Sequence, residues 1–513
     1  MQREKGASPS EESRVHRAKF SSLTPQALRA SFESLGKPDP HLSRSVDARQ
    51  ELDLRVGVAF TRLLSWRLMG AARKRFSPAT RLISYGPCQT PALYLSAARA
   101  HEIESFQAER FWRVSLHAIS GAGTPAVQLQ WLGGELAEKS ERAGRVTKSK
   151  ERAELVISRA SSHGARLVVR AARTRTDRLK APSALNTVGL LVACSKAMAM
   201  SPKAVMSTAE KLYAGGFISY PRTESTKYDE TFDVRGVLRQ HSRHPVWGGV
   251  ASRLLHERYS SSAPIASRGV DRGDHPPITP TRVATRDDVG GGMAWRVYEL
   301  VCRSFFGSLG DDVRLDHTSY QLVLEADSRG GEELFTHEVT AVRAEGFGAA
   351  CPWVLRDART GGAAVDWRTG DRLVVDRKPF CESGMTRPPR FLQEHELIQG
   401  MDAHRIGTDA SMATHVANIV ERGYVVVCDE QGFPLRPPQR PGSKGRKLER
   451  QIGRYMVPTP LGLALVRLLC DDEAAASMTR TSETLLGSEF ESEDTTLLAL
   501  PEIRARIEDE VAQ

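Results

Sequence analysis

The sequence predicts a multidomain protein of mixed α and β structure, and three observations lead to this fold class. With 513 residues, 40% of them hydrophobic, the chain is longer than the roughly 250–300 residues at which a single core stops growing. The spacing of apolar residues changes along the chain from the helical period to strand alternation and back. Two strand-rich stretches flank a helical block, so we expect that block to be an insertion into a β domain.

The first region, residues 1–108, is predicted to be helical after a polar start. Thr24 followed by Pro25 is typical of an N-cap and first helical position. The segment QELDLRVGVAFTRLLSWRL then places apolar residues at helical spacing. We interpret this region as the first part of a helical base domain.

Residues 109–178 are predicted to form the first part of a β domain. In FWRVSLHAI, apolar residues alternate with polar ones, which indicates a half-buried strand. AVQLQWL and ARLVVRA continue the pattern. Strand alternation returns in residues 307–385, in SYQLVLEA, LFTHEVTAV and DRLVVDRKPF, which we interpret as the second part of the same domain.

The helical block between these β segments covers residues 179–306. Ser201, Pro202 and Gly215 provide an N-cap, a first helical residue and a stop for one of its helices. FISYPRTES follows directly, and we predict that it is a short strand entering a proline turn.

Residues 386–470 are predicted to form a second helical part that resembles a winged helix-turn-helix. Two helical segments, FLQEHELIQGMDAHRIGT and DASMATHVANIVERGY, precede the strand-like VVV. Such units either bind duplexes or serve as packing modules. A basic loop at 431–454 is rich in Pro and Gly, so we expect it to be disordered and able to touch phosphates. The tail, 471–513, is acidic.

Lys and Arg outnumber Asp and Glu by ten, which suits a polyphosphate partner as well as a merely basic enzyme. The seven cysteines never form C-x-x-C, so no zinc site of ordinary spacing can be drawn. No apolar run approaches the ~20 residues of a spanning helix, and we expect no membrane partner.

Tyr220 and Arg222 are the first candidates for chemistry. A neutral phenol is a weak nucleophile and needs a cation to stabilise its phenolate and the charge on phosphorus. Arg222 offers a guanidinium of phosphate-matching geometry two residues on. The alternative is that Tyr220 is an ordinary amphipathic turn residue.

His275 follows Asp274 in the proline-rich loop DRGDHPPITPT. Its imidazole could donate a hydrogen bond to a phosphate oxygen, and the alternative is that it is an ordinary surface residue. Arg49, Arg55 and Arg62 form a row on the first long helix, which suits nucleic acid or a solvated face. No Walker loop, HExxH or GxSxG motif occurs.

The order and spacing of ISYPRTES after AEKLYAGG, GDHPPITPT and HRIGTDASMATHVANIVERGYV carry a resemblance. Together with VDARQELDLRVGVAFTR, ISYGPCQTPAL and VPTPLG, they make the chain similar to the type IA DNA topoisomerases, most of all to the eukaryotic topoisomerase III beta branch. The resemblance covers about residues 17–467. It implies a toroidal core with a helical gate domain, a β hinge domain and a winged-helix-like domain.

The resemblance also implies roles. Tyr220 matches the nucleophile that forms a 5′-phosphotyrosine with one DNA strand, so that strand passage and religation need no ATP. Arg222 and His275 match phosphate-contacting residues. Positions expected along the single-strand path are Lys211, Arg49, Arg55, Arg62, Gln89 and Arg422.

In this family a Toprim domain precedes the matched region and supplies a general acid and the carboxylates that hold Mg²⁺. The resemblance therefore implies Mg²⁺ as a cofactor. Because the resemblance begins within about twenty residues of Met1, we expect the Mg²⁺ ligands to be absent from this chain and the chain alone to cleave DNA weakly. Two explanations fit the absence of a Toprim domain: the sequence is a truncated gene product, or another polypeptide supplies that domain.

The expected function is thus relaxation of negative supercoils and decatenation in the nucleus. Expected partners are single-stranded DNA, with RNA as a second candidate, and a recombination or scaffold protein. The alternative is a catalytically inactive protein that binds single-stranded nucleic acid through phosphate contacts and stacking.

Overall fold

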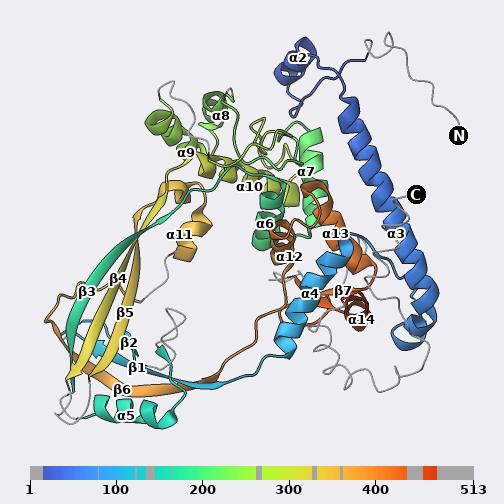
Figure 1. Cartoon of the computed structure of the whole chain (residues 1–513). Helices are drawn as coiled ribbons and strands as arrows, with labels where there is room; N and C mark the ends of the chain where they lie inside the picture. Colours follow the sequence, from blue (N-terminus) through green and yellow to red (C-terminus); the bar gives the residue numbers. More distant parts are fainter. Residues whose placement is uncertain are drawn as a thin grey trace.

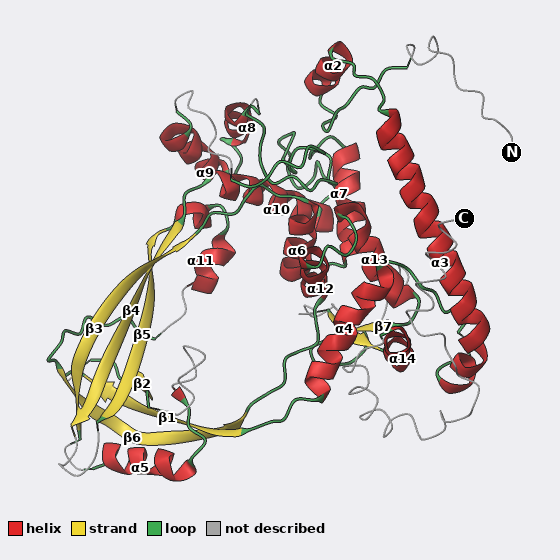
Figure 2. Cartoon of the chain, in the orientation of Figure 1, coloured by secondary structure: helices red, strands yellow, loops and turns green. Residues whose placement is uncertain are grey.

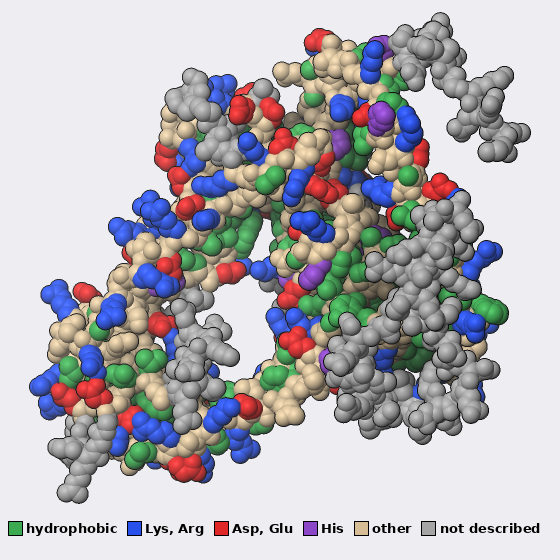
Figure 3. All heavy atoms as spheres, viewed as in Figure 1, with side chains coloured by type: hydrophobic (Ala, Val, Ile, Leu, Met, Phe, Trp, Pro, Cys, Tyr) green, Lys and Arg blue, Asp and Glu red, His purple; other side chains and the backbone are tan. Residues whose placement is uncertain are grey.

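The computed structural model shows a ring of helical and β elements around an open centre (Figure 1). The structure describes residues 15–470 except 79, 122–123, 134–144, 163–164, 231, 261–267, 326–331, 359–361 and 436–453. Most of the predicted basic loop and all of the acidic tail lie outside the described residues. Figure 3 shows that the opening in the ring passes between the β elements and the helices even with side chains drawn.

The described N-terminal part contains the helices α2 (Pro25–Glu33), α3 (Pro40–Arg75) and α4 (Gln89–Glu104). The predicted start of α2 is confirmed, because the Thr24 side chain accepts a hydrogen bond from the Ala27 amide. Asp39 caps α3 in the same way, by accepting from the amides of residues 41 and 42. These side chains satisfy amides that have no partner inside the helix.

Most of α3 has no covering element within the described part of the chain. Of its 36 residues only Leu64 and Ala72 are buried, and Trp66 is 75% exposed. The other large apolar residues that α3 exposes are Leu42, Leu52, Leu54, Val58 and Leu63. A soluble monomer rarely leaves so many large apolar side chains in water, so the surface of this helix is suited to contact with protein.

Six antiparallel strands close into a barrel, with the order β1-β2-β5-β4-β3-β6. They are β1 (Arg110–Ile119), β2 (Val127–Trp131), β3 (Arg166–Leu179), β4 (Val313–Glu325), β5 (Glu333–Ala344) and β6 (Arg372–Met385). Each strand predicted from alternation is confirmed. Because β1 to β3 precede the helical block and β4 to β6 follow it, the barrel unites segments that are far apart in sequence. Helix α5 (Lys150–Ala160) packs along β1 and β6 at the lower end (Figure 2).

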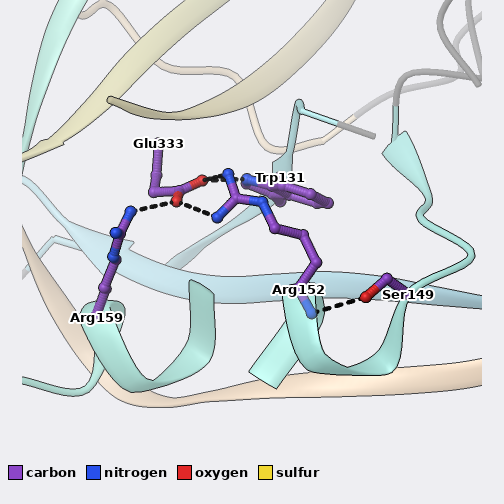
Figure 4. Close-up of polar contacts among 5 residues, drawn as sticks. All are labelled: Trp131, Ser149, Arg152, Arg159 and Glu333. Atoms are coloured by element: carbon purple, nitrogen blue, oxygen red, sulfur yellow. Dashed lines mark hydrogen bonds and ion pairs between the residues drawn. The ribbon is translucent and has the colours of Figure 1, made fainter. Parts of the chain in front are cut away.

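A buried carboxylate joins α5 to the barrel. Glu333, at the start of β5, accepts hydrogen bonds from Arg152, Arg159 and the Trp131 indole (Figure 4). The two Arg152 contacts measure 2.7 and 3.0 Å. A buried carboxylate is tolerated only when cations and donors surround it, and here α5 supplies both cations.

The helical block contains α6 (Thr187–Met198), α7 (Pro202–Ala214), α8 (Val234–His241), α9 (Gly248–Arg253), the π-helical turn η2 (Leu254–Arg258) and α10 (Gly292–Leu309). After β5 come η3 (Gly346–Ala349) and α11 (Pro352–Ala358). Ser201, Pro202 and Gly215 bound α7 as predicted. In the described part of the chain no single helix has the length and apolar composition of a membrane span. Helices α6 and α7 pass that test only as a pair, bent by 114°.

The C-terminal part contains α12 (Glu394–Ala403), α13 (Asp409–Glu421), β7 (Val425–Cys428), β8 (Tyr455–Pro458) and α14 (Pro460–Leu469). The two helices and the strand at VVV appear as predicted. Strand β8, which was not predicted, pairs antiparallel with β7 and completes a two-stranded wing.

The ring closes where the helical block meets this C-terminal part. Helix α6 packs on α12, and α7 packs on α13. Among the described residues, two side-chain polar contacts cross the junction: Lys203 pairs with Glu421 at 2.7 Å, and the Thr187 hydroxyl donates to Asp409 at 3.2 Å. The Lys203 pair is exposed and contributes little stability, so apolar packing carries most of the junction.

Candidate active site

Tyr220 lies in an irregular segment directly after α7. Gly216 has a φ of +72°, which turns the chain out of the helix at little steric cost because glycine lacks a Cβ. The segment was predicted to be a short strand, and this is wrong: Ile218 forms only an isolated bridge with Pro280. The opposing segment contains Pro277 and Pro280, which have no amide hydrogen, so a ladder cannot continue.

The ring of Tyr220 lies between two other rings. His275 meets it edge-on with a centroid separation of 4.7 Å, and Tyr213 of α7 approaches from another side at 5.3 Å. Tyr220 is half-buried. Burial, and secondarily the neighbouring Tyr220, raise the pKa of Tyr213, so Tyr213 stays neutral around pH 7.

The Tyr220 hydroxyl remains uncommitted within the described part of the chain. It makes no side-chain hydrogen bond among the described residues, and it is not one of their polar atoms that are buried without a partner. A half-buried phenol whose oxygen still reaches solvent is free to meet a ligand. This arrangement differs from that of an ordinary core tyrosine, whose hydroxyl finds a protein partner.

Arg222 is held by Glu210 of α7. The guanidinium donates to one carboxylate oxygen from Nε at 3.1 Å and from Nη2 at 2.6 Å. Both side chains remain partly exposed, Arg222 at 33% and Glu210 at 45%. The sequence predicted a guanidinium two residues after the tyrosine, but it gave no signal for Glu210, ten residues before the tyrosine and on a helix.

Asp274 braces the loop of His275 against the loop of Tyr220. Its carboxylate accepts from the Ser225 hydroxyl at 2.5 Å and from the Glu224 amide at 2.7 Å. Although burial opposes ionisation, these and further hydrogen bonds hold the pKa of Asp274 below its usual value. The Thr223 hydroxyl also donates to the His275 carbonyl at 2.5 Å. The imidazole therefore stands on a loop fixed at several points.

Ser21, in the segment before α2, reaches the same cluster. Its hydroxyl lies 2.8 Å from Nδ1 of His275, and its carbonyl accepts a hydrogen bond of 2.7 Å from the Tyr220 amide. No sequence pattern indicated this residue, because it lies 254 positions from its partner. The cluster thus combines residues from three distant segments.

The remaining predicted positions belong to four elements, α3, α4, α7 and α13 with the residue after it. Lys211 is exposed on α7, next to Glu210, and Arg422 is exposed at the end of α13. Arg49, Arg55 and Arg62 are exposed on α3, where Arg55 pairs with Glu51. Gln89 is only 8% exposed, and its amide donates to Ser84, so little of it is open to a strand.

The described residues contain no group of three or more His, Cys, Asp or Glu side chains placed to hold a metal ion. The adjacent acids Asp311 and Asp312 instead pair with Arg258 and Arg268. The described carboxylates therefore do not fit a divalent cation, and no catalytic step is assigned to a metal held by them.

A family model described as DNA topoisomerase matches residues 37–436. The chain is 37% identical over 454 residues to the DNA topoisomerase 3-beta of Arabidopsis thaliana, covering 88% of this chain and 46% of that protein. It is 37% identical over 427 residues to the DNA topoisomerase 3-beta-1 of Homo sapiens, covering 83% of this chain and 46% of that protein. The chain thus spans about half the length of these relatives.

Among solved structures, full-length topoisomerase I from Thermotoga maritima superimposes with a TM-score of 0.62 at 19% identity. The match covers 91% of this chain and 68% of that chain, and at this identity it supports the fold alone. The family model and the relatives together settle the family: the chain belongs to the type IA DNA topoisomerases and is similar to their topoisomerase III beta branch.

Proposed function

We propose that this chain carries the strand-cleaving tyrosine of a type IA DNA topoisomerase. Tyr220 would attack a phosphodiester of single-stranded DNA, forming a bond from its Oη to phosphorus while the bond from phosphorus to O3′ breaks. The phenol proton leaves to solvent or a base, and O3′ takes up a proton. The observation that carries the proposal is the uncommitted Tyr220 hydroxyl beside His275.

Resealing is the reverse of this step. The 3′ hydroxyl attacks the 5′-phosphotyrosine and the phenol leaves, so the ester retains the energy of the broken bond and no ATP is required. Between the two steps the ring would open and admit another strand, which relaxes negative supercoils or unlinks DNA circles. The small polar contacts at the α6–α12 and α7–α13 junction are compatible with reversible opening.

Arg222 and His275 would stabilise the charge that develops on the phosphate. A guanidinium matches two phosphate oxygens at once, and donors placed where charge develops commonly contribute the largest share of catalysis. Arg222 must then exchange Glu210 for the phosphate. His275 would offer its second ring nitrogen, Nε2, while Ser21 holds Nδ1.

We further propose Mg²⁺ as the cofactor, held by carboxylates other than the described ones, since those do not form a metal site. Mg²⁺ would help to position the phosphates. Single-stranded DNA is the proposed substrate, with RNA as a second candidate and a scaffold or recombination protein as a further partner. DNA as the substrate supports a nuclear location.

The test uses an oligonucleotide labelled at its 3′ end in which sulfur replaces O3′ at the cleavage position. A thiolate leaves without a proton donor, so the experiment does not depend on a general acid. We expect label to become covalently attached to the protein and this attachment to be lost in Tyr220→Phe. Tyr94→Phe, which changes an exposed tyrosine of α4, should retain it.

The binding-only function would give another result. In that case the oligonucleotide binds with the usual salt sensitivity, no label is attached to either protein, and Tyr220→Phe binds as well as the wild type.

A further inference from the structure

A polar hollow lies where the helical block meets the barrel. It has a volume of about 650 Å³ and is partly open to solvent. Its walls come from the end of α9 and η2 on one side and from the ends of β3, β4 and β5 on the other. No residue of the Tyr220 cluster lines it.

Five arginines surround this hollow: Arg178, Arg253, Arg258, Arg268 and Arg314. Three carboxylates also line it, those of Glu257, Asp311 and Asp312, so the lining carries an excess of two positive charges. Arg258 pairs with Asp311, and Arg268 lies 3.4 Å from Asp312. These pairs account for two of the five guanidinium groups.

The other three, Arg178, Arg253 and Arg314, have no side-chain hydrogen bond or ion pair within the described ranges. Arg178 on β3 also stands directly opposite Arg314 on β4 in the ladder. Like charges at directly opposed positions destabilise a sheet. An anion bound between the two guanidinium groups would convert this repulsion into attraction.

We infer that this hollow binds the sugar-phosphate backbone of a nucleic-acid strand, at a place separate from the cleavage site. Guanidinium groups bind phosphate oxygens in pairs. The described lining offers no aromatic side chain for base stacking, so binding through the sugar-phosphate backbone would not depend on sequence. The inference rests on the proposed function only for the choice of nucleic acid as the polyanion.

One loop connects the hollow to the cleavage site. Arg268 lines the hollow, and His275 lies seven residues further along the same segment. Between them, the amide of Thr226 donates to the carbonyl of Val270 at 2.8 Å, which fixes the loop to the segment of Tyr220. A strand held in the hollow would therefore lie beside the part of the helical block that carries the nucleophile.

The test measures by anisotropy how tightly a fluorescent single-stranded oligonucleotide binds at different salt concentrations. Every variant is made in the full chain carrying Tyr220→Phe, so that cleavage plays no part. We expect Arg178→Ala with Arg314→Ala to lower affinity about 10-fold. The slope of log affinity against log salt should fall by about 1.4, since each phosphate contact contributes roughly 0.7 on single strands. Arg178→Lys with Arg314→Lys keeps both charges and should keep the slope.

The matched control is Arg356→Ala with Arg377→Ala, which removes two arginines that are 80% and 71% exposed and lie outside the hollow. An unchanged slope in the Arg178 and Arg314 alanine variant, or an equal loss in this control, overturns the inference. So does a loss of the slope in the lysine variant.

A further arm uses inorganic tripolyphosphate and calorimetry. If the alanine variant loses tripolyphosphate binding while oligonucleotide binding is unchanged, the hollow serves a small phosphate compound and the nucleic-acid inference fails. The covalent labelling of Tyr220 is a separate readout, so failure of the proposed cleavage would leave these binding results interpretable.

Discussion

The Ser21 hydroxyl lies 2.8 Å from Nδ1 of His275, although the two residues are 254 positions apart. The same serine accepts a hydrogen bond from the Tyr220 amide through its carbonyl. One residue in the segment before α2 therefore contacts both the segment of Tyr220 and the imidazole of His275. We interpret Ser21 as a positioning residue that fixes the orientation of the imidazole.

Changing Ser21 to Ala should lower the rate of cleavage of the sulfur-substituted oligonucleotide about 5-fold, because one hydrogen bond of about 1 kcal/mol to the imidazole is lost. The affinity for the oligonucleotide should change little, and the pH profile of the rate should shift. Ser21→Thr should restore most of the rate, since it retains the hydroxyl. Ser22→Ala is the neighbouring control, and an equal effect there would show a general disturbance of the segment.

Changing Glu210 to Gln should raise the affinity for an uncleaved oligonucleotide about 3-fold. Glu210 binds Arg222 through two contacts and repels a phosphate that approaches the same guanidinium. The pair is partly exposed, so its effect is limited to about 1 kcal/mol or less. Titration by anisotropy at low salt measures the change.

The control for this experiment is Glu224→Gln, which removes an exposed carboxylate two residues after Arg222. An equal gain there would indicate only a change in overall charge. A loss of affinity in Glu210→Gln would show that Glu210 places Arg222 for phosphate and does not compete with it.

Neighbouring glutamates at the start of β5 offer a second matched pair. Glu333 is buried with two arginines and an indole, whereas Glu332 is exposed and pairs with Arg170 alone among the described residues. Glu333→Gln should destabilise the barrel by about 2–3 kcal/mol, because it breaks a buried ion pair whose arginines still reach some solvent. Glu332→Gln should cost about 0.5 kcal/mol or less. Urea unfolding, with hydrogen exchange measured at the amides of β2 and β5, distinguishes the two variants.

Local signals in the sequence predicted the helices and strands well. Thr24 with Pro25 and Ser201 with Pro202 marked helix starts that the structure confirms, because an N-cap depends on neighbours within three residues. The alternation of apolar and polar residues predicted the barrel strands because it too is a local signal. The strand predicted before Tyr220 failed because its pairing depends on a distant segment whose prolines lack amide hydrogens.

The candidate site shows the same division. Tyr220, Arg222 and His275 were predicted from the order of motifs, and the structure brings the rings of Tyr220 and His275 together. Ser21 and Glu210 could not be found, because their roles arise only when separate segments fold against each other. The opposed Arg178 and Arg314 were equally hidden, since strand register decides which residues face one another.

His241 makes the stability of the helical block depend on pH. It is fully buried, and its Nδ1 accepts a hydrogen bond of 3.0 Å from the Trp247 indole, which only a neutral imidazole can do. Burial, and then the nearby His244, lower the pKa of His241 to about 4. The unfolded chain takes up a proton near pH 6.5 and the folded one does not, so stability is complete above pH 6.5 and is lost as the pH falls toward 4. The loss should reach about 3 kcal/mol.

His241→Gln keeps an acceptor but cannot be protonated. Urea unfolding between pH 7 and pH 4.5 should therefore show a smaller change of the free energy of unfolding with pH in this variant. His256→Gln, at an exposed site, should behave as the wild type. Equal slopes in the wild type and His241→Gln would mean that another group controls the acid sensitivity.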